Sequence, residues 1–267
     1  MKEKIVLIES DYHAAHLSGL THPRYQIKED DKHSYRRKFG EMQKVMFNWR
    51  KKELGKLGPV DVHIINGDVL EGAAELNKGI ELITSDLNLQ IDMACDIIPI
   101  AKLKKKGQRY MTFGTPYHGT RYDLERQVAK RLECDIDDTQ ELEINGLKIN
   151  CRHKIGNTSL PHTRHTALLR ENLWNMVKAE KGLSQDADVF IFSHRHFCSD
   201  CSGILPWQRA FVTPCLQGGT SFGSRQCSSA IDIGFLVLKI RSQHDWDFKQ
   251  VLQPLEFLAP EVKVIKG

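Results

Sequence analysis

Short apolar runs alternate with longer amphipathic stretches along the first half of the chain. Runs at 4–8, 60–65 and 109–113 have the length and composition of buried strands. Between them, apolar side chains recur every three or four residues, which is typical of helices packed on a core. The stretches predict helices from Tyr35 to about Gly55, over about 82–106 and over 123–133, with Pro99 expected to kink or divide the second.

The second half of the chain has a different pattern that is richer in strands. Asn145-Gly146 lies between two alternating runs, which is a strong hairpin signal. A helix is expected over about 166–181, followed by a strand in the apolar run 187–192 and a β-rich stretch over 203–255. The apolar face of that helix is expected to consist of Leu169, Leu173, Met176 and Val177.

These elements favour an α/β fold in which parallel strands and crossover helices come first and a mixed or antiparallel part follows. No internal repeat, low-complexity segment or linker interrupts the 267 residues. We therefore expect a single domain over 1–267.

The composition of the chain indicates the cellular compartment and the kinds of binding partner to expect. No apolar run approaches the roughly 20 residues of a membrane-spanning helix, and the first residues read as a strand, so a cytoplasmic protein without membrane contact is expected. The seven cysteines are scattered, and Cys198 and Cys201 form a CxxC without a second pair, which favours free thiols. With a net charge of +4, the basic run at 102–109 is interpreted as a solvated helix end rather than a nucleic-acid patch.

Asp and His residues follow five of the predicted strands. Ligands of open α/β sheets bind beyond the carboxyl ends of the strands, so these positions are the candidates for chemistry. Alternation along an extended segment puts residues i and i+2 on the same side, so each Asp-x-His or His-x-His pair can reach one ion or a pair of ions. The residues are Asp11, His13, Asp68, His118, His153, His194 and His196.

Carboxylates with imidazoles are ligands that suit Mn, Fe or Zn. A carboxylate can bridge two ions about 3.5–4 Å apart, as two-metal hydrolases require. Asp68 is the best bridge candidate, because Gly67 before it permits a close backbone approach. Each motif alone is more often a turn or a capping residue than a metal site. Their occurrence in order, each at a strand end, favours the metal interpretation.

The order of these motifs resembles the calcineurin-like metallophosphoesterases, whose pattern is Asp-x-His, Gly-Asp, Gly-Asn-His, a single His and Gly-His-x-His. The third motif here has the form GTPYH, over 114–118, and resembles phage-type members of that family. The resemblance spans residues 11–196. The chain supplies Asp11-Tyr12-His13, Gly67-Asp68, His118 in the variant motif, His153 and Ser193-His194-Arg195-His196.

The resemblance implies a four-layer α/β/β/α sandwich with a mixed sheet and a dinuclear site at the strand ends. The two divalent ions are expected to be Mn, with Fe, Zn or Ni as alternatives. His118 matches the family histidine that contacts the phosphate and can protonate the leaving group, so it is the expected catalytic residue. By the same resemblance, Asp11, His13, Asp68 and His196 hold one metal, and Asp68, His153 and His194 hold the other.

Two positions depart from the family pattern. Thr115 stands where the family has a metal-binding Asn, and it is a poorer neutral ligand, which puts the filling of the second metal position in question. Ser193 replaces the usual Gly before the histidine pair, at small cost unless that position needs a positive φ.

The expected activity is hydrolysis of phosphate esters by a metal-activated hydroxide. Mild basicity and the resemblance favour phosphodiesters, with nucleotides or nucleic acid as the candidate partners. Thr115 and Arg164 are the candidate substrate-binding residues, although Arg164 fits a solvated helix start equally well. The alternative is a catalytically impaired scaffold or binding protein of the same fold. The residues after His196 do not fit the metallo-β-lactamase pattern, and an amidohydrolase barrel would have His-x-His after its first strand rather than in the last third of the chain.

Overall fold

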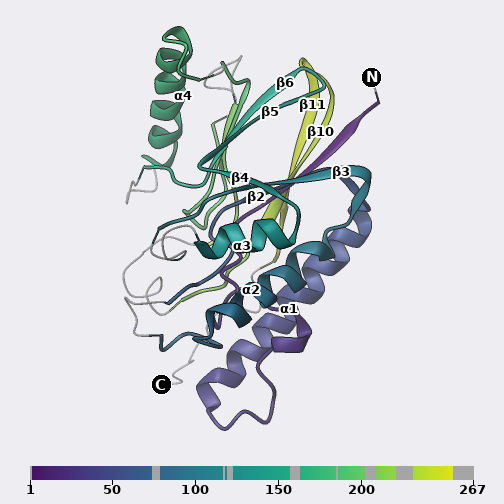
Figure 1. Ribbon diagram of the computed structural model, residues 1–267, viewed down its shortest axis with the longest axis vertical. Coiled ribbons are helices and arrows are strands. Elements are labelled where there is room, and N and C mark those ends of the chain that lie inside the picture. The colour runs from purple at the N-terminus through teal and green to yellow at the C-terminus, as the bar shows by residue number, and fades with distance from the viewer. Residues whose placement is uncertain are drawn as a thin grey trace, which may run out of the picture.

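Two mixed β-sheets lie face to face at the centre of the protein, as the computed structural model shows (Figure 1). The structure describes residues 2–73, 79–116, 118, 123–156, 163–184, 186–201, 209–220 and 231–254. The first sheet has the order β11 (Asp245–Leu252), β10 (Gly234–Ser242), β1 (Lys4–Glu9), β2 (Val60–Asn66), β3 (Leu103–Thr112) and β4 (Asp135–Asp137). The second has the order β5 (Thr139–Ile144), β6 (Leu147–Arg152), β7 (Val189–Phe192), β9 (Arg209–Val212) and β8 (Ser199–Asp200).

Strand directions agree with the expected change between the two halves of the chain. Strands β1 to β4 pair in parallel in sequence order, whereas β10 and β11 complete the sheet by antiparallel pairing beside β1. The second sheet combines the antiparallel hairpin of β5 and β6 with parallel pairs of β6, β7 and β9. The predicted Asn145-Gly146 turn connects that hairpin, with both residues at positive φ.

Alternating side chains of the strands build the layers. Val6 and Ile8 of β1 pack in the same buried cluster as Ile149 and Ile191 of the second sheet, so this cluster lies between the sheets. Leu7 points to the other side and packs with the end of α1. Helices α1 (Ser34–Leu57), α2 (Leu87–Ile97) and α3 (Asp123–Arg131) cover the first sheet, and α4 (Arg164–Glu180) covers the second (Figure 1). The four-layer α/β/β/α arrangement is therefore confirmed.

The helix predicted over about 82–106 is shorter in the structure. Asp86 caps α2 by accepting N–H groups of Asn88 and Leu89, and α2 ends at Ile97, before a 3-10 turn over Ile98–Ile100 that contains Pro99. Strand β3 begins at Leu103, six residues before the predicted strand. The basic run at 102–109 therefore lies on a strand, and its interpretation as a helix end was wrong.

The predicted apolar face of the last helix was also wrong. Leu173, Met176 and Val177 are exposed, by 61%, 43% and 40%, and only Leu169 of the predicted set is partly buried in the core. The helix packs on the second sheet through the buried Ala167 and Leu168. The amides of Asn172 and Asn175, which carry no hydrophobic signal, continue its buried face, so periodicity pointed to the wrong side.

Two further expectations concern the surface and the thiols. Within the described ranges, no helix is long and apolar enough to span a membrane. The six cysteines of the described part are free, as predicted, and Cys227 lies outside it.

Candidate metal centre

The six predicted metal ligands meet at one edge of the two sheets. Asp11 and His13 follow β1, Asp68 follows β2, His153 follows β6, and the histidine pair follows β7. Because β1 and β2 run in parallel, their following loops lie side by side. The N–H of Asp11 donates to the carbonyl of Gly67 over 3.1 Å, and the N–H of His13 donates to that of Asp68 over 3.0 Å. The sheets thus fix the positions from which the ligand side chains project.

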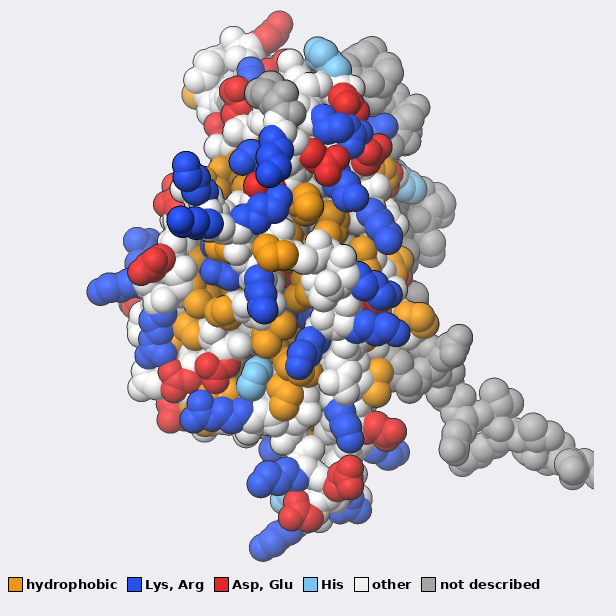
Figure 2. Space-filling model, turned by 90° about the vertical axis from the view of Figure 1, so that its right-hand side faces the viewer, with side chains coloured by type: hydrophobic (Ala, Val, Ile, Leu, Met, Phe, Trp, Pro, Cys, Tyr) orange, Lys and Arg blue, Asp and Glu red, His pale blue; other side chains and the backbone are white. Residues whose placement is uncertain are grey.

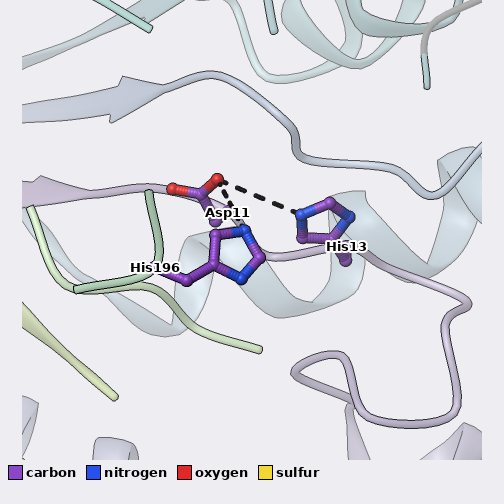
Figure 3. Close-up of side chains that lie close together, drawn as sticks. All are labelled: Asp11, His13 and His196. Atoms are coloured by element: carbon purple, nitrogen blue, oxygen red, sulfur yellow. Dashed lines mark ion pairs between the residues drawn. The ribbon is translucent and has the colours of Figure 1, made fainter. Parts of the chain in front are cut away.

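Asp11, His13 and His196 form the first cluster (Figure 3). Oδ1 of Asp11 lies 3.2 Å from Nε2 of His196 and 4.0 Å from Nε2 of His13. Asp11 and His13 come from the segment after β1, while His196 reaches the carboxylate from the segment after β7, as Figure 3 shows. Residues almost 200 positions apart therefore place three metal-ligating atoms within one small volume.

Asp68, His153 and His194 form the second cluster. Oδ2 of Asp68 lies 2.9 Å from Nε2 of His153 and 3.7 Å from Nδ1 of His194. The two clusters adjoin, since Oδ1 of Asp11 is also 4.0 Å from Nε2 of His153. His194 and His196 belong to different clusters. The structure brings all six ligands together, and the bridging role of Asp68 stays a prediction.

Two buried polar atoms of the first cluster have no hydrogen-bond partner among the described residues, namely Oδ1 of Asp11 and Nε2 of His13. Nδ1 of His13 is 2.8 Å from Oε2 of Glu71, so the imidazole donates its proton there and turns the lone pair of Nε2 towards Asp11. Burial lowers the pKa of His13, which favours this neutral form. Two facing electron-pair donors in a buried site fit a divalent cation between them.

Five of the six ligands have a left-handed backbone. The φ angles are 52° at Asp11, 44° at His13, 50° at Asp68, 71° at His194 and 55° at His196. Such conformations are uncommon outside glycine, and they cluster at functional sites where the surrounding structure holds them. The alternation argument for the i, i+2 pairs was therefore wrong, because the ligands lie on tight turns beyond the strands.

The glycine of the second motif has a clear steric role. Gly67 has a φ of +76°, and a Cβ there would lie 2.5 Å from Nδ1 of His153. Ser193, in contrast, is not among the described residues with positive φ, so replacing the family glycine there causes no backbone strain. Its hydroxyl lies 2.7 Å from that of Thr213 and accepts the side-chain N–H of Asn66 over 2.6 Å. Ser193 thus ties β7 to β2 beside the clusters.

Charge coupling shapes the protonation of the metal-free site. Burial alone would raise the pKa of Asp68, but the charge and hydrogen bond of His153 hold it well below its usual range. Burial alone would lower the pKa of His153, but the Asp68 carboxylate raises it to about 9. A metal ion that bound His153 would therefore displace its proton.

Glu71 is the main site residue that the sequence interpretation missed. Its carboxylate orients His13, and its carbonyl accepts the Nδ1 proton of His118 over 3.0 Å. The same Oε2 lies 3.7 Å from Nδ1 of His118. The available signal was an acidic residue three positions after Asp68, within the loop of the second motif.

The variant third motif acts on Asp68. Thr115 is buried, and its N–H and hydroxyl both donate to Oδ1 of Asp68, over 2.6 and 2.8 Å. His118 lies at the mouth of the first cluster, with its ring 4.7 Å from that of His13. The side chain of Arg164 lies outside the described part of the chain, although its backbone begins α4.

Glu125 of α3 connects the loops that follow β2 and β3 through its carboxylate. Its carboxylate accepts the N–H of Val69 over 3.3 Å and that of Gly114 over 2.7 Å. Burial, together with the charge of Asp68, raises the pKa of Glu125 from its usual 4.5 to about 7. The folded protein therefore keeps a proton on this group that the unfolded chain has lost.

We expect Glu125 to contribute a loss of stability in the metal-free protein as the pH rises from 4.5 to about 7, and Glu125→Gln to remove this contribution. Between these values only the folded state binds the proton, so the free energy of unfolding falls with rising pH. At about 1.4 kcal/mol for each pKa unit, the total is of the order of 3 kcal/mol. Urea unfolding at a series of pH values measures it. The difference between the wild type and the variant should shrink by that amount across this pH range, whereas a constant difference would mean that Glu125 does not cause the change.

A buried ion pair lies behind the first cluster. The guanidinium of Arg50 donates to both carboxylate oxygens of Glu9, each over 2.7 Å, and the hydroxyl of Tyr12 donates to the same carboxylate over 2.6 Å. Nε2 of His63 lies 2.9 Å from it. Tyr12 is the residue between Asp11 and His13, so this network anchors the ligand loop to β1 and α1.

No protein-family model matches the chain, and no curated protein sequence does either. Similar solved structures include Vps29 of Entamoeba histolytica complexed with Zn²⁺, with a TM-score of 0.44, 12% identity and coverage of 93% of this chain and 98% of that one. A novel archaeal phosphodiesterase has a TM-score of 0.44 and 13% identity, with coverage of 92% of this chain and 99% of that one. A predicted phosphoesterase of Streptococcus pneumoniae has a TM-score of 0.39 and 12% identity, with coverage of 95% of this chain and 99% of that one.

Proposed function

We propose that this protein is a metal-dependent phosphoesterase of the calcineurin-like type that hydrolyses phosphodiesters at a dinuclear site. The observation that carries the proposal is a pair of buried atoms, Oδ1 of Asp11 and Nε2 of His13, which lie 4.0 Å apart beside a second carboxylate–histidine cluster. Neither atom has a hydrogen-bond partner among the described residues. Two neighbouring ligand sets of this composition suit a pair of hard or borderline divalent cations, with Mn²⁺ as our first choice.

Each residue has a role that follows from its contacts. Asp11, His13 and His196 would hold one ion, and Asp68, His153 and His194 the other. Bound cations would supply an activated water and stabilise charge on the phosphoryl oxygens. Glu71 orients the His13 ring, and Thr115 holds the Asp68 carboxylate in place.

His118 would serve the leaving group. Its Nδ1 lies 3.0 Å from the Glu71 carbonyl, which orients the ring, and Nε2 is the nitrogen proposed to transfer the proton. Oε2 of Glu71 lies 3.7 Å from the same Nδ1 and further restricts the orientation of the ring. These contacts support a general acid at this position.

We expect His118→Ala to reduce hydrolysis by roughly 10²–10⁴-fold for substrates with a poor alkoxide leaving group, because general acid catalysis is worth that much. Diesters with a nitrophenol leaving group need no proton, so their rate should fall far less. Steady-state rates with a graded series of leaving groups measure the difference. An equal loss across the series would assign His118 to electrostatic binding of the phosphate instead.

The proposal is tested by hydrolysis of bis-p-nitrophenyl phosphate and p-nitrophenyl phosphate with metal-stripped protein, before and after addition of Mn²⁺. Metal-dependent turnover with preference for the diester is the expected result. Preference for the monoester would retain the chemistry and change the substrate class. No turnover of either compound by protein shown to bind Mn²⁺ would overturn the proposal.

A non-catalytic scaffold is the second candidate, and Thr115 is the observation that favours it. Its hydroxyl donates to Asp68 rather than offering the amide oxygen that the family Asn provides. A second ion would then have one ligand fewer. Such a protein would bind a single ion and hydrolyse neither nitrophenyl ester.

A further inference from the structure

Exposed lysines gather at the end of the strands opposite to the metal centre. We call this surface the basic face. The metal ligands follow the carboxyl ends of β1 and β2, whereas the basic face lies where α1 ends and β3 begins. The strands between them have six and seven residues, which separates the two regions by roughly 20 Å. The basic face consists of Lys51, Lys52, Lys102, Lys105 and Lys106.

A bulge in β3 displays part of the basic face. Val60 of β2 pairs with Leu103 and Val62 pairs with Gln108, so β3 advances five residues while β2 advances two. The extra residues contain the lysine run, which leaves the regular ladder at this point. The insertion therefore turns a run of consecutive lysines outwards.

The end of α1 brings further lysines to the same place. Leu54 and Leu57 of α1 pack in one apolar cluster with Ala101 and Leu103, so helix and strand are neighbours here. Figure 2 faces this side of the molecule and shows Lys and Arg side chains gathered across it, with Asp and Glu mostly towards its upper and lower ends. Two segments 50 residues apart in the sequence thus share one basic surface.

The nearby carboxylates are already neutralised by other lysines. Asp61 pairs with Lys104 over 2.6 Å and with Lys4 over 3.4 Å, and Glu53 pairs with Lys56 over 2.6 Å. Within the described ranges, none of the five lysines of the basic face pairs with a carboxylate. Their charges therefore add up without an ion pair to a carboxylate of the described residues.

We propose that the basic face binds the phosphate backbone of a nucleic acid, away from the metal centre. Lysine ammonium groups neutralise successive phosphates as point charges and read no sequence, so the expected binding is electrostatic and not sequence-specific. The face complements such a polyanion in charge and offers contacts from both a helix and a strand. The proposal does not depend on the hydrolytic activity proposed above.

A membrane surface is the other large polyanion, and the residues disfavour it. Helices that dock on anionic membranes combine cations with inserted aromatic or aliphatic side chains. The exposed large hydrophobic residues of the described part lie elsewhere. Most are on α4 or directly after it, and the others are at the start of α1, in the loop after β2 and at the end of β11. The basic face thus has the charge but no apolar anchor.

The lysines on β3 also have a simpler explanation, which the experiment must distinguish from nucleic-acid binding. Strand β4 pairs only with Tyr110–Thr112, so the preceding part of β3 has an open edge. Lysines on open edges prevent pairing with another sheet. That explanation covers the lysines of β3 but gives no reason for Lys51 and Lys52 on α1.

The test measures binding of a fluorescent duplex DNA of about 20 base pairs by anisotropy, between about 50 and 200 mM salt. Five phosphate contacts predict a slope of about −4.5 in log affinity against log salt. The variant Lys52→Gln/Lys105→Gln/Lys106→Gln should reduce the slope by up to about 2.7 and weaken binding at least about tenfold at low salt. Its circular dichroism and elution volume should match those of the wild type.

The control Lys28→Gln/Lys130→Gln/Lys181→Gln removes the same charge from exposed positions outside the basic face and should keep the wild-type slope. Equal losses in both variants would overturn the proposal, because net charge alone would then explain binding. Absence of DNA binding by the wild type would also overturn the proposal. Two further results can accompany that outcome, namely binding of the wild type to phosphatidylserine vesicles and self-association of the basic-face variant. The latter result would assign the lysines to edge protection.

Discussion

Asp68→Asn is expected to reduce metal-dependent hydrolysis of bis-p-nitrophenyl phosphate by at least about 10³-fold, since metal ions supply several kcal/mol of transition-state stabilisation. Asn has the same shape and can still accept the hydrogen bonds of Thr115. It lacks the charge that holds a cation and that raises the pKa of His153. The side chain should therefore remain in place while the site loses affinity for metal. Rates with the wild type and the variant at saturating Mn²⁺ measure the effect.

A matched control for this substitution is Asp86→Asn. Asp86 caps α2 through two backbone N–H groups, and Asn is an equally good capping residue, so the charge change is the same and the structural change is small. Its activity should equal that of the wild type. If Asp68→Asn retained most of its activity with metal present, the carboxylate would not be a metal ligand.

Arg50→Met is expected to lower the free energy of unfolding by about 3–5 kcal/mol, the usual effect of removing one partner of a buried ion pair. Glu9 and Arg50 are both fully buried, and the bidentate contact between them is the reason that the Glu9 carboxylate can stay charged. Without Arg50, only Tyr12 and His63 remain beside that charge. Urea denaturation of the metal-free proteins measures the loss as a shift of the midpoint.

Two further variants identify the cause of this loss. Glu9→Gln combined with Arg50→Met removes the unpaired charge and should recover much of the stability, because Gln can still accept from Tyr12. Arg131→Met breaks an exposed pair with Asp92 and should leave the midpoint almost unchanged. A double variant no more stable than Arg50→Met would mean that lost packing, not the charge, explains the effect.

The order of elements and the residues that gather in the two clusters could be predicted from the sequence, because both depend on local patterns. Apolar runs mark strands that are buried on both faces, as in β1, where Val6 and Leu7 pack on opposite sides. Ligands of such sheets bind beyond the carboxyl ends of the strands, so polar residues there are the candidates for a site. The histidines that follow β6 and β7 could be predicted from this position at the strand ends.

The parts that the sequence did not reveal depend on contacts between distant segments. Nothing local marks Glu71 as the partner of His13, or Arg50 as the partner of Glu9 across 41 positions. The left-handed turns at Asp11 and His13 are held by backbone hydrogen bonds from the loop after β2, so composition alone could not indicate them. The bulge in β3 likewise appears only in its pairing with β2.

The helix before β7 shows a different limit of periodicity. Its exposed stripe is more hydrophobic than its buried one, since Leu173 faces solvent while Asn172 and Asn175 are buried. Hydrophobic periodicity assumes that the apolar stripe faces the core, and here the packing of Ala167 and Leu168 decides the orientation instead. A single strong contact near the start of a helix can therefore override the pattern along the rest of it.

The most direct test of the two-cluster account is a titration of metal-stripped protein with Mn²⁺, following bound metal and diester turnover in the same samples. The account predicts two bound ions for each chain, with turnover rising as the second ion binds. His196→Ala and His153→Ala should each remove one ion, because these residues belong to different clusters. Failure of the wild type to bind Mn²⁺, or loss of both ions in each variant without loss of fold, would contradict two separate metal positions.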